Sequence, residues 1–410
     1  MHRRAFLTTS ALALCGASLR AASPAAARLF APGLPRADDW RRTTSLVPAR
    51  VSFDRVMRTT VGLRPHRDSG FVLRAEKFDD RTVVHNYGHG GAGMSLAWGT
   101  GAMAADLALK HKDRRAAVLG CGSPGLTAAR QLQRRGFRVT IYTKTVPPDT
   151  TSNMSMASFT PASGLVQADR RTRQWDEQFR KAAAISYREL QALAGGEYGV
   201  YWIDAYAAID DPAAARVSNA DDGGLLSDVR IGRDREMLGP GEHPFPTQYA
   251  IRTPSLNIEP SKYLDKLVVD FLAAGGRIVI RTFDSPRDLM NLPENIIINS
   301  TGLGSLTLFN DQELVPVKGQ LSLLAPQPDV QYRVGGRITG PDGDTSLVSM
   351  NPRSDGIVIG NLQERGSWSL EPLDDVRERN ITAAMQFFDA MQPAASPPTV
   401  SVGSSMPVRG

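Results

Sequence analysis

The chain has 410 residues, enough for two packed domains, and its 41% hydrophobic and 22% charged residues are typical of a soluble globular protein. The formal net charge is +6, and three arginines within the first 27 residues leave only +3 for the rest. So small a charge argues against a nucleic-acid partner. No run of about 18 apolar residues follows the amino-terminal segment, so we predict no membrane span.

Residues 1–27 are typical of an export signal. Arg3 and Arg4 precede a modest apolar stretch at residues 5–19, and small alanines that suit cleavage follow. The arginine pair in this setting resembles a twin-arginine signal, which would deliver the folded protein to the twin-arginine export machinery. A general secretory leader and a disordered start are the alternatives. We therefore expect an exported protein, periplasmic or extracellular, in which residues 28–50 form a linker.

Residues 83–99 contain four glycines within positions 88–93, followed by a helical pattern that runs to Leu109. This arrangement predicts a concave set of backbone N–H groups at a helix N-terminus, which favours the electron-rich edge of a cofactor. A plain turn, with His85 and Tyr87 as core residues, is the alternative interpretation.

A second glycine-rich turn has the spacing of a dinucleotide-binding motif. Residues 116–119 predict a buried parallel strand, residues 126–135 a helix and residues 139–142 a second strand. Between the first strand and the helix the spacing is G-x-G-x-x-G, which allows a tight turn, close approach to a pyrophosphate and close helix packing. The three glycines are Gly120, Gly122 and Gly125.

The second strand of this unit lacks its usual acidic end. A carboxylate normally binds a ribose hydroxyl there, but Thr143 and Lys144 occupy the position. Either the ribose contact comes from elsewhere, or Lys144 contacts a phosphate. Cys121, inside the glycine turn, is interpreted as a small filler rather than a nucleophile.

Several short motifs together resemble the D-amino-acid oxidase family of FAD-dependent enzymes. The segment at 85–93 is the most specific of them, and the resemblance covers roughly residues 50–395. The segments that carry it are 62–67 (GLRPHR), 85–93 (HNYGHGGAG), 150–152 (TTS), 298–302 (INSTG), 318–320 (KGQ) and 351–356 (NPRSDG).

The order of these segments differs from the family's. There the dinucleotide motif opens the chain and the H-N-Y-G-H-G-G signature closes it, whereas here the signature comes first. The resemblance therefore indicates a circular permutation, which is feasible when chain ends lie close together. We expect an α/β fold in which a Rossmann-type FAD-binding domain accompanies an α+β substrate domain with a mixed sheet. The FAD-binding domain would comprise 70–161 and 250–318, the substrate domain 50–69, 162–249 and 319–395, and a flexible tail 396–410.

Further elements are predicted from hydrophobic periodicity. Residues 262–274 predict a helix, and residues 206–245, rich in Asp, Gly and Pro, are expected to form loops. The remaining predicted strands are 199–202, 278–280, 296–299, 320–324, 346–350 and 357–359.

The resemblance also implies roles for individual residues. Arg64 matches the arginine that binds the substrate carboxylate, and Gly91 matches the glycine whose carbonyl accepts the substrate amine. His85 and His89 are expected to pack and to hydrogen-bond rather than to catalyse. No metal site is expected. Contacts to FAD are expected from Gly90, Gly93, Met94, Ser95, Gly120, Gly122, Gly125, Lys144, Thr150, Thr151, Ser152, Thr301 and Gly302.

The implied activity is oxidation of the CH–NH2 group of D-amino acids, with hydride transfer from Cα to flavin N5 and reoxidation by O2 to give keto acid, ammonia and H2O2. The tyrosines that usually cover the substrate are missing, because the aligned positions near Thr345 and Ser349 are small; Tyr332 is one possible substitute. We expect an open pocket for neutral D-amino acids, with Arg333 or Arg353 as candidates for a second cation. The alternatives are a glycine or amine oxidase, a quinone-linked D-amino-acid dehydrogenase, and a flavin-binding protein without turnover.

Overall fold

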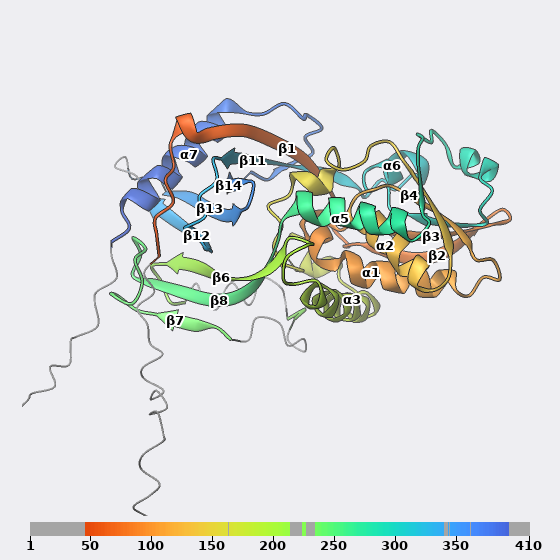
Figure 1. The fold of residues 1–410 in the computed structure, drawn as a ribbon, viewed down its shortest axis with the longest axis horizontal. Coiled ribbons are helices and arrows are strands. Elements are labelled where there is room, and N and C mark those ends of the chain that lie inside the picture. Colours follow the sequence, from red (N-terminus) through yellow and green to blue (C-terminus); the bar gives the residue numbers. More distant parts are fainter. Residues whose placement is uncertain are drawn as a thin grey trace, which may run out of the picture. The chain divides into compact units, whose positions relative to one another are not determined.

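The computed structural model describes residues 46–162, 164–213, 224–226, 234–339, 343, 345–360 and 362–392. The predicted signal peptide at 1–27, most of the predicted linker and the tail at 396–410 lie outside these residues. The described residues build two sheets, a smaller one of six strands and a larger one of nine (Figure 1). None of the described helices is both long enough and apolar enough to cross a membrane.

The smaller sheet is of the Rossmann type. Five of its strands run parallel, and β2 is added to one edge as an antiparallel hairpin with β3. The central strand β10 is buried at all four positions, as expected for a parallel strand covered on both faces. In spatial order the strands are β2 (Val72–Phe78), β3 (Arg81–Tyr87), β10 (Ile296–Asn299), β4 (Arg115–Leu119), β5 (Arg138–Thr143) and β9 (Arg277–Ile280).

A helical layer covers this sheet. Helix α1 (Gly93–Ala108) packs against α2 (Ser123–Arg134) and α3 (Arg173–Ala192), and α2 also contacts α5 (Pro260–Ala273) (Figure 1). Because α1 has neighbours on several sides, it is apolar nearly all round rather than along one stripe. At Gly99 a Cβ atom would lie 2.0 Å from a carbonyl oxygen of α3, so glycine permits the close approach of the two helices.

The larger sheet is mixed, because β12 and β6 run parallel while its other pairs are antiparallel. Helix α7 (Asp374–Asp389) packs on one face and buries Phe387 against it. In spatial order the strands are β1 (Val56–His66), β11 (Val315–Leu324), β14 (Gly356–Gly360), β13 (Thr345–Arg353), β12 (Tyr332–Thr339), β6 (Val200–Ile209), β8 (Tyr249–Ile258) and β7 (Glu236–Leu238), with β15 (Glu364–Arg365) beside β11.

Short helical elements connect these layers. The helix α6 follows β10, and single 3₁₀ turns lie in the connections. Helix α6 spans Gly304–Leu308. The 3₁₀ elements are Phe53–Arg55, Gly90–Ala92, Thr151–Met154, Ala168–Arg170 and Pro286–Asn291.

The mixed α/β architecture confirms the predicted fold class, but sheet membership differs from the expected division of the chain. Strand β8 lies in the larger sheet, although residues 250–318 were assigned to the FAD-binding domain. Helix α3 packs on α1, although residues 162–249 were assigned to the substrate domain. Strand β8 was missed because Arg252 and Pro254 interrupt its apolar pattern, and antiparallel pairing with β6 along its whole length holds it in place. The expected loops at 206–245 also contain the end of β6 and β7.

The two ends of the described chain meet on the α7 side of the larger sheet. The hydroxyl of Tyr332 donates to the carbonyl oxygen of Val47 at 3.1 Å and lies 3.7 Å from the sulfur of Met391. Ala49 is buried in the same core, and the side chain of Gln327 exchanges two hydrogen bonds with the backbone of Arg50. Residues 46–50, the end of the predicted linker, are therefore held against this core by Ala49 and by the backbone of Val47 and Arg50.

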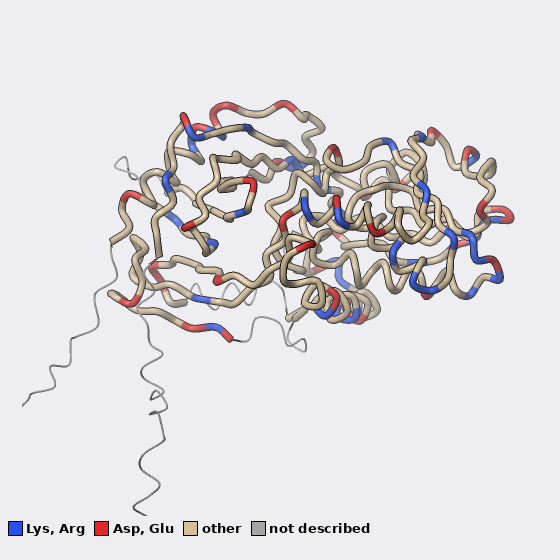
Figure 2. The backbone as a smooth tube through the Cα atoms, viewed as in Figure 1, with Lys and Arg blue, Asp and Glu red and all other residues tan. Residues whose placement is uncertain are grey.

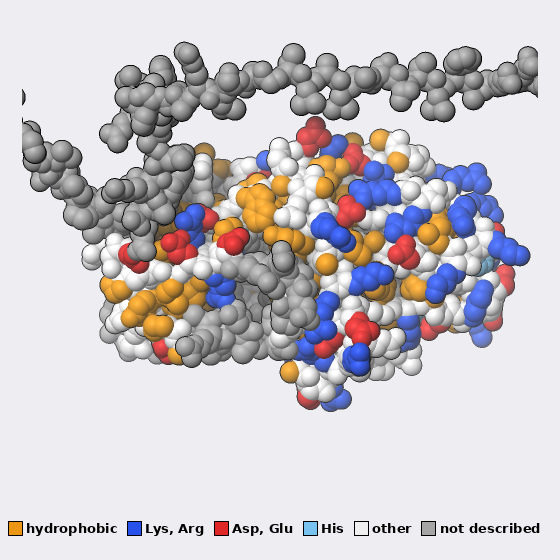
Figure 3. All heavy atoms as spheres, turned by 90° about the horizontal axis from the view of Figure 1, so that it is seen from below, with side chains coloured by type: hydrophobic (Ala, Val, Ile, Leu, Met, Phe, Trp, Pro, Cys, Tyr) orange, Lys and Arg blue, Asp and Glu red, His pale blue; other side chains and the backbone are white. Residues whose placement is uncertain are grey.

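Charged residues of both signs are interspersed along the backbone (Figure 2). In the face shown in Figure 3, basic side chains gather over the half that carries the smaller sheet. Several of the arginines of the helical layer are paired with acids, for example Arg134 with Glu189 at 2.9 Å and Arg135 with Asp106 at 2.8 Å. Such pairing limits the net field of this surface.

Candidate active site

A cavity of about 740 Å³ receives residues from both sheets. The smaller sheet contributes the loops that follow the carboxyl ends of β3, β4, β5, β9 and β10, which is where ligands bind in open α/β sheets. The larger sheet contributes Gly319 and the end of β1, residues 62–65. Most of the residues predicted to contact FAD line this one cavity, namely Gly90, Gly93, Met94, Gly120, Gly122, Lys144, Thr150, Thr151, Ser152, Thr301 and Gly302, and so do Arg64 and Gly91.

The dinucleotide turn follows β4 as the sequence predicts. Gly120 has a φ of +103°, and a Cβ atom there would lie 2.6 Å from the carbonyl oxygen of Ser300, so the turn requires glycine. Gly125 does not line the cavity; a Cβ there would lie 2.0 Å from the carbonyl oxygen of Gly120, so this glycine lets α2 pack closely on the turn. The N-terminus of α2 thus approaches the cavity, where it favours an anionic group.

The second glycine segment forms the concave turn that its composition predicts. Gly90 has a φ of +52°, and a Cβ there would lie 2.7 Å from the carbonyl oxygen of Gly164. Helix α1 begins at Gly93, directly after this turn. Ser95 is the second predicted cofactor residue that does not line the cavity. Its hydroxyl instead donates to the carbonyl of Ser158 at 3.1 Å and accepts from the N–H of Thr160 at 2.8 Å.

The cavity wall after β5 and β9 has no acid in the expected position. The hydroxyl of Thr143 is directed to the carbonyl of Thr145 at 2.7 Å, and Lys144 is exposed. The segment after β9 adds Arg281, which stacks on Phe283 at 4.8 Å, and Asp284. Asp284 is the single carboxylate among the described lining residues, so it is the candidate for the ribose contact that β5 does not supply. Sequence reasoning missed it, although it follows the strand predicted at 278–280.

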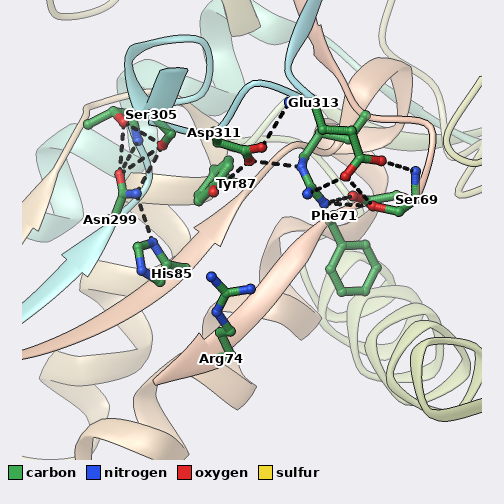
Figure 4. Close-up of polar contacts among 12 residues, drawn as sticks. Ser69, Phe71, Arg74, His85, Tyr87, Asn299, Ser305, Asp311 and Glu313 are labelled. Atoms are coloured by element: carbon green, nitrogen blue, oxygen red, sulfur yellow. Dashed lines mark hydrogen bonds and ion pairs between the residues drawn. The ribbon is translucent and has the colours of Figure 1, made fainter. Parts of the chain in front are cut away.

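Two arginines of the GLRPHR segment have opposite environments. Arg67 contacts Asp311 at 2.9 Å and Glu313 at 2.5 Å, and Asp311 also accepts the hydroxyl of Tyr87 at 2.7 Å (Figure 4). Arg64 has no carboxylate partner in the described part of the chain and donates only to the carbonyl oxygen of Leu362, at 3.4 Å. Arg67 is therefore neutralised by the protein, whereas Arg64 presents a free guanidinium to the cavity.

The position of Arg64 depends on a glycine in the neighbouring strand. A Cβ atom at Gly319 would lie 2.6–2.8 Å from the atoms of the Arg64 guanidinium. The guanidinium therefore occupies the space that any other residue at 319 would fill. Burial lowers the pKa of Arg64, yet an arginine this basic stays charged. A partly desolvated guanidinium can bind a carboxylate through two parallel hydrogen bonds.

Four residues considered for the substrate pocket lie elsewhere. Tyr332 is only 2% exposed in the core beneath α7, because the alternation of β12 directs it to that face. Arg353 forms two contacts with Asp355, at 2.8 and 2.9 Å, and is thereby paired. Neither Arg333 nor Ser349 is among the residues that line the cavity. Tyr332 therefore does not provide an aromatic wall.

Two further residues of the site are deeply buried. Cys121 lines the cavity and is 2% exposed, and burial raises the pKa of its thiol to about 12. The thiol is therefore protonated at neutral pH, which fits a filler better than a nucleophile. His89 contacts the hydroxyl of Thr100 at 3.0 Å, and burial lowers its pKa to about 4. A neutral, packed imidazole of this kind fits a structural role.

The residues of the cavity fit a flavin dinucleotide. The turns at Gly120 and Gly90 each leave a space that a Cβ atom would fill. Two buried polar atoms of lining residues, the hydroxyl of Ser300 and Oδ1 of Asn86, have no hydrogen-bond partner among the described residues. Together with two helix N-termini, these features provide donors and acceptors for a pyrophosphate, a ribityl chain and a flavin ring.

Comparison with known proteins decides the family. The family model described as DAO, FAD dependent oxidoreductase, matches residues 19–107 and 115–406. The chain belongs to this family. FAD is the cofactor of the DAO family, so the chain is an FAD-dependent oxidoreductase, and the cavity described above is the candidate site for its cofactor.

The DAO family relatives span most of the chain at low identity. The chain is 26% identical over 277 residues to a D-amino acid oxidase of Dugesia ryukyuensis, covering 65% of this chain and 74% of that protein. It is 26% identical over 264 residues to the human D-aspartate oxidase, covering 63% and 71%. Among solved structures, glycine oxidase from Bacillus cereus ATCC 14579 has a similar fold, with a TM-score of 0.50, 15% identity and coverage of 68% and 79%.

Proposed function

We propose that this protein oxidises D-amino acids at the CH–NH2 group, with O2 as the final electron acceptor. When bound, FAD supplies the redox chemistry by accepting a hydride from the substrate. The chain itself then needs to bind the carboxylate, accept the amine and exclude water. The free guanidinium of Arg64 is the observation that carries this proposal.

Arg64 is suited to hold an amino-acid carboxylate. It lies on β1 in the wall of the FAD cavity, and the described residues give it no counter-charge. A bound carboxylate would form two charge-assisted hydrogen bonds with it and would compensate its burial. The carbonyl of Gly91, in the same cavity wall, is a candidate acceptor for the substrate amine. Carboxylate and amine bound at two points orient the Cα–H bond of one enantiomer toward the cofactor.

The charges in the cavity favour a neutral side chain. Besides Arg64, the cationic lining residues are Lys144 and Arg281, which follow β5 and β9 of the dinucleotide-binding sheet. On the β1 side, Arg64 is the single cation among the described lining residues. One cation matches one carboxylate, so we expect neutral D-amino acids to be better substrates than D-aspartate.

The experiment is a substrate screen with the purified flavoprotein. Without air, the flavin absorbance is followed after addition of each of a panel of D- and L-amino acids, glycine and proline. Peroxide is then measured in air. We expect bleaching by several neutral D-amino acids, no bleaching by their L-forms, and peroxide in air. Bleaching without peroxide would indicate a dehydrogenase with another acceptor, bleaching only by glycine a glycine oxidase, and no bleaching a flavoprotein without amino-acid turnover.

We also infer that the chain is a circular permutant of the family's order. Support comes from the family model, which matches as two segments separated by residues 108–114, the connection from α1 to β4. The described chain ends also meet, since Val47 and Met391 both contact Tyr332. A rearranged chain would begin at Arg114, run to Met391, continue through a short linker into Val47 and end at Asp113. This chain should fold and bind FAD. Failure of this rearranged chain to bind FAD, while the natural order binds it, would argue against permutation.

The amino-terminal segment motivates a proposal of export. Arg3 and Arg4 precede an apolar stretch, and a protein that binds a cofactor tightly must acquire it before it crosses a membrane folded. Replacing both arginines by lysine should keep the flavoprotein in the cytoplasm, whereas the unaltered chain should fractionate with exported proteins. Equal export of both chains would indicate a general secretory leader.

A further inference from the structure

A chain of side-chain hydrogen bonds runs from Glu76 on β2 to Thr301 in the wall of the FAD cavity, and one backbone group fixes its direction. Figure 4 shows its middle part, from His85 through Asn299 to Ser305. The N–H of Thr301 lies 3.2 Å from Oδ1 of Asn299. A backbone N–H can only donate, so the carboxamide of Asn299 must direct its oxygen to Thr301 and its NH2 group to the other side. The backbone therefore determines which end of this amide is the oxygen and which is the NH2 group.

The orientation of Asn299 determines the protonation state of His85. The NH2 group of Asn299 lies 3.1 Å from Nδ1 of His85, so Nδ1 must accept and cannot carry a proton. The remaining nitrogen, Nε2, lies 2.8 Å from a carboxylate oxygen of Glu76 on β2. His85 is thus neutral, with its proton on Nε2 and donated to Glu76.

On the cavity side, the same amide orients Thr301. The NH2 group of Asn299 donates to the hydroxyl of Ser305 at 2.9 Å, and the hydroxyl of Thr301 donates to Oδ1 of Asn299 at 2.8 Å. The hydroxyls of Ser305 and Thr301 are 2.9 Å apart, and the hydroxyl of Ser305 also lies 3.3 Å from Oδ1 of Asn299, so the hydroxyl of Thr301 has a protein acceptor, Asn299 or Ser305, whichever of the two hydroxyls donates to the other. The one hydroxyl proton of Thr301 is therefore engaged inside the protein, and Thr301 lines the cavity. Thr301 can present only an acceptor lone pair to a bound group.

We propose that Glu76, His85 and Asn299 form a positioning chain that holds Thr301 as a hydrogen-bond acceptor in the wall of the FAD site, and that protonation of His85 weakens FAD binding by breaking this chain. A proton on Nδ1 would face the NH2 group of Asn299, donor against donor. The amide must then move or rotate, and Thr301 loses the acceptor for both its N–H and its hydroxyl. The proposal rests on the FAD cofactor of the family and not on amino-acid turnover.

The surroundings of His85 favour the neutral form. Burial lowers its pKa, while Glu76 and Asp311 act in the opposite direction and Arg74 adds to the lowering. Arg74 is also 3.6 Å from Glu76, and the rings of Tyr87 and Phe309 pack edge-on against the imidazole. Because the pKa of His85 is lowered in the folded protein, an opened form with an ordinary pKa binds the proton more readily as the pH falls. FAD affinity should therefore be constant at neutral pH and should fall only below the ordinary pKa of histidine, near 6.5.

The test measures release of FAD from the holoprotein as a function of pH, by the fluorescence of free flavin after dilution between about pH 5 and pH 8. For the unaltered protein we expect affinity to fall on the acid side by about two- to tenfold, the range for loss of one hydrogen bond. Glu76→Gln retains an acceptor for Nε2 but removes the charge that raises the pKa of His85, so its acid fall should move to lower pH. Glu177→Gln, at an exposed position in α3, is the matched control and should leave the profile unchanged.

A second variant should favour protonated His85, whereas Glu76→Gln disfavours it. Asn299→Asp still accepts from Thr301 but offers a carboxylate to Nδ1, so it should stabilise protonated His85 and abolish the acid fall. Circular dichroism and thermal unfolding establish that each variant is folded. If Asn299→Asp does not fold, the pH profile of Glu76→Gln decides, since Glu76 is half-exposed. An acid fall at the same pH in Glu76→Gln as in the unaltered protein, or its persistence in Asn299→Asp, would overturn the proposal. If the pH profiles of FAD release behave as expected but no amino acid is oxidised, the proposed function is overturned and the positioning chain is not.

Discussion

Gly319→Ala should weaken carboxylate binding without disturbing the cofactor. The new Cβ would lie 2.6–2.8 Å from the guanidinium of Arg64, whereas ordinary contacts begin at 3.4 Å. The guanidinium must therefore retreat by about 0.7 Å, a distance that a flexible arginine tolerates but a bidentate pair does not. Loss of one of two charge-assisted hydrogen bonds is worth about 1.5–3 kcal/mol, or about ten- to a hundredfold in affinity.

The assay is the perturbation of the flavin spectrum by benzoate, a carboxylate without an amine, together with the KM for the best substrate. Gly335→Ala is the control, since a Cβ there has no neighbour closer than 4.0 Å in the same sheet. In an Arg64→Ala background, Gly319→Ala should add nothing, because the group that it displaces is gone. Unchanged benzoate affinity in Gly319→Ala, or equal effects with and without Arg64, would show that Gly319 does not set the position of the guanidinium.

Three further predictions follow from the site. Arg64→Ala should lower kcat/KM by a factor equivalent to about 3 kcal/mol or more while FAD content stays constant, as measured by steady-state kinetics and the ratio of flavin to protein absorbance; normal turnover would remove Arg64 from the site. Gly120→Ala should strain a residue at φ +103° and force the turn away from Ser300, so purified protein should contain little FAD; full FAD content would contradict the turn geometry. Because burial raises the pKa of Cys121 to about 12, native protein should resist alkylation at pH 8 until it is unfolded, and rapid labelling would show an accessible thiolate.

The sequence predicted the parts of the site whose residue types are dictated by backbone geometry. Gly120 and Gly90 adopt positive φ and touch neighbouring carbonyls, so no other residue type is suitable there, and their spacing can be recognised without a structure. The apolar runs of β4 and β10 were recognised for the same reason, since strands covered on both faces leave few alternatives.

The remainder depended on contacts between distant segments. Nothing in the local sequence shows that Tyr332 faces α7 rather than the cavity. The alternation of a strand divides its side chains between two faces, but it does not show what packs against each face. Asp284 and Gly319 reach the cavity only through the pairing of β5 with β9 and of β1 with β11. The direction of the chain from Glu76 to Thr301 likewise requires the position of one backbone N–H.

We propose that the free guanidinium of Arg64 and a bound flavin together select D-amino acids. The most direct test is to mix the purified flavoprotein, without air, with D-alanine and in parallel with L-alanine, and to record the flavin absorbance over time. We expect complete bleaching by the D-enantiomer and none by the L-enantiomer. Equal bleaching by both enantiomers, or a fully loaded flavin that no D-amino acid reduces, would contradict it.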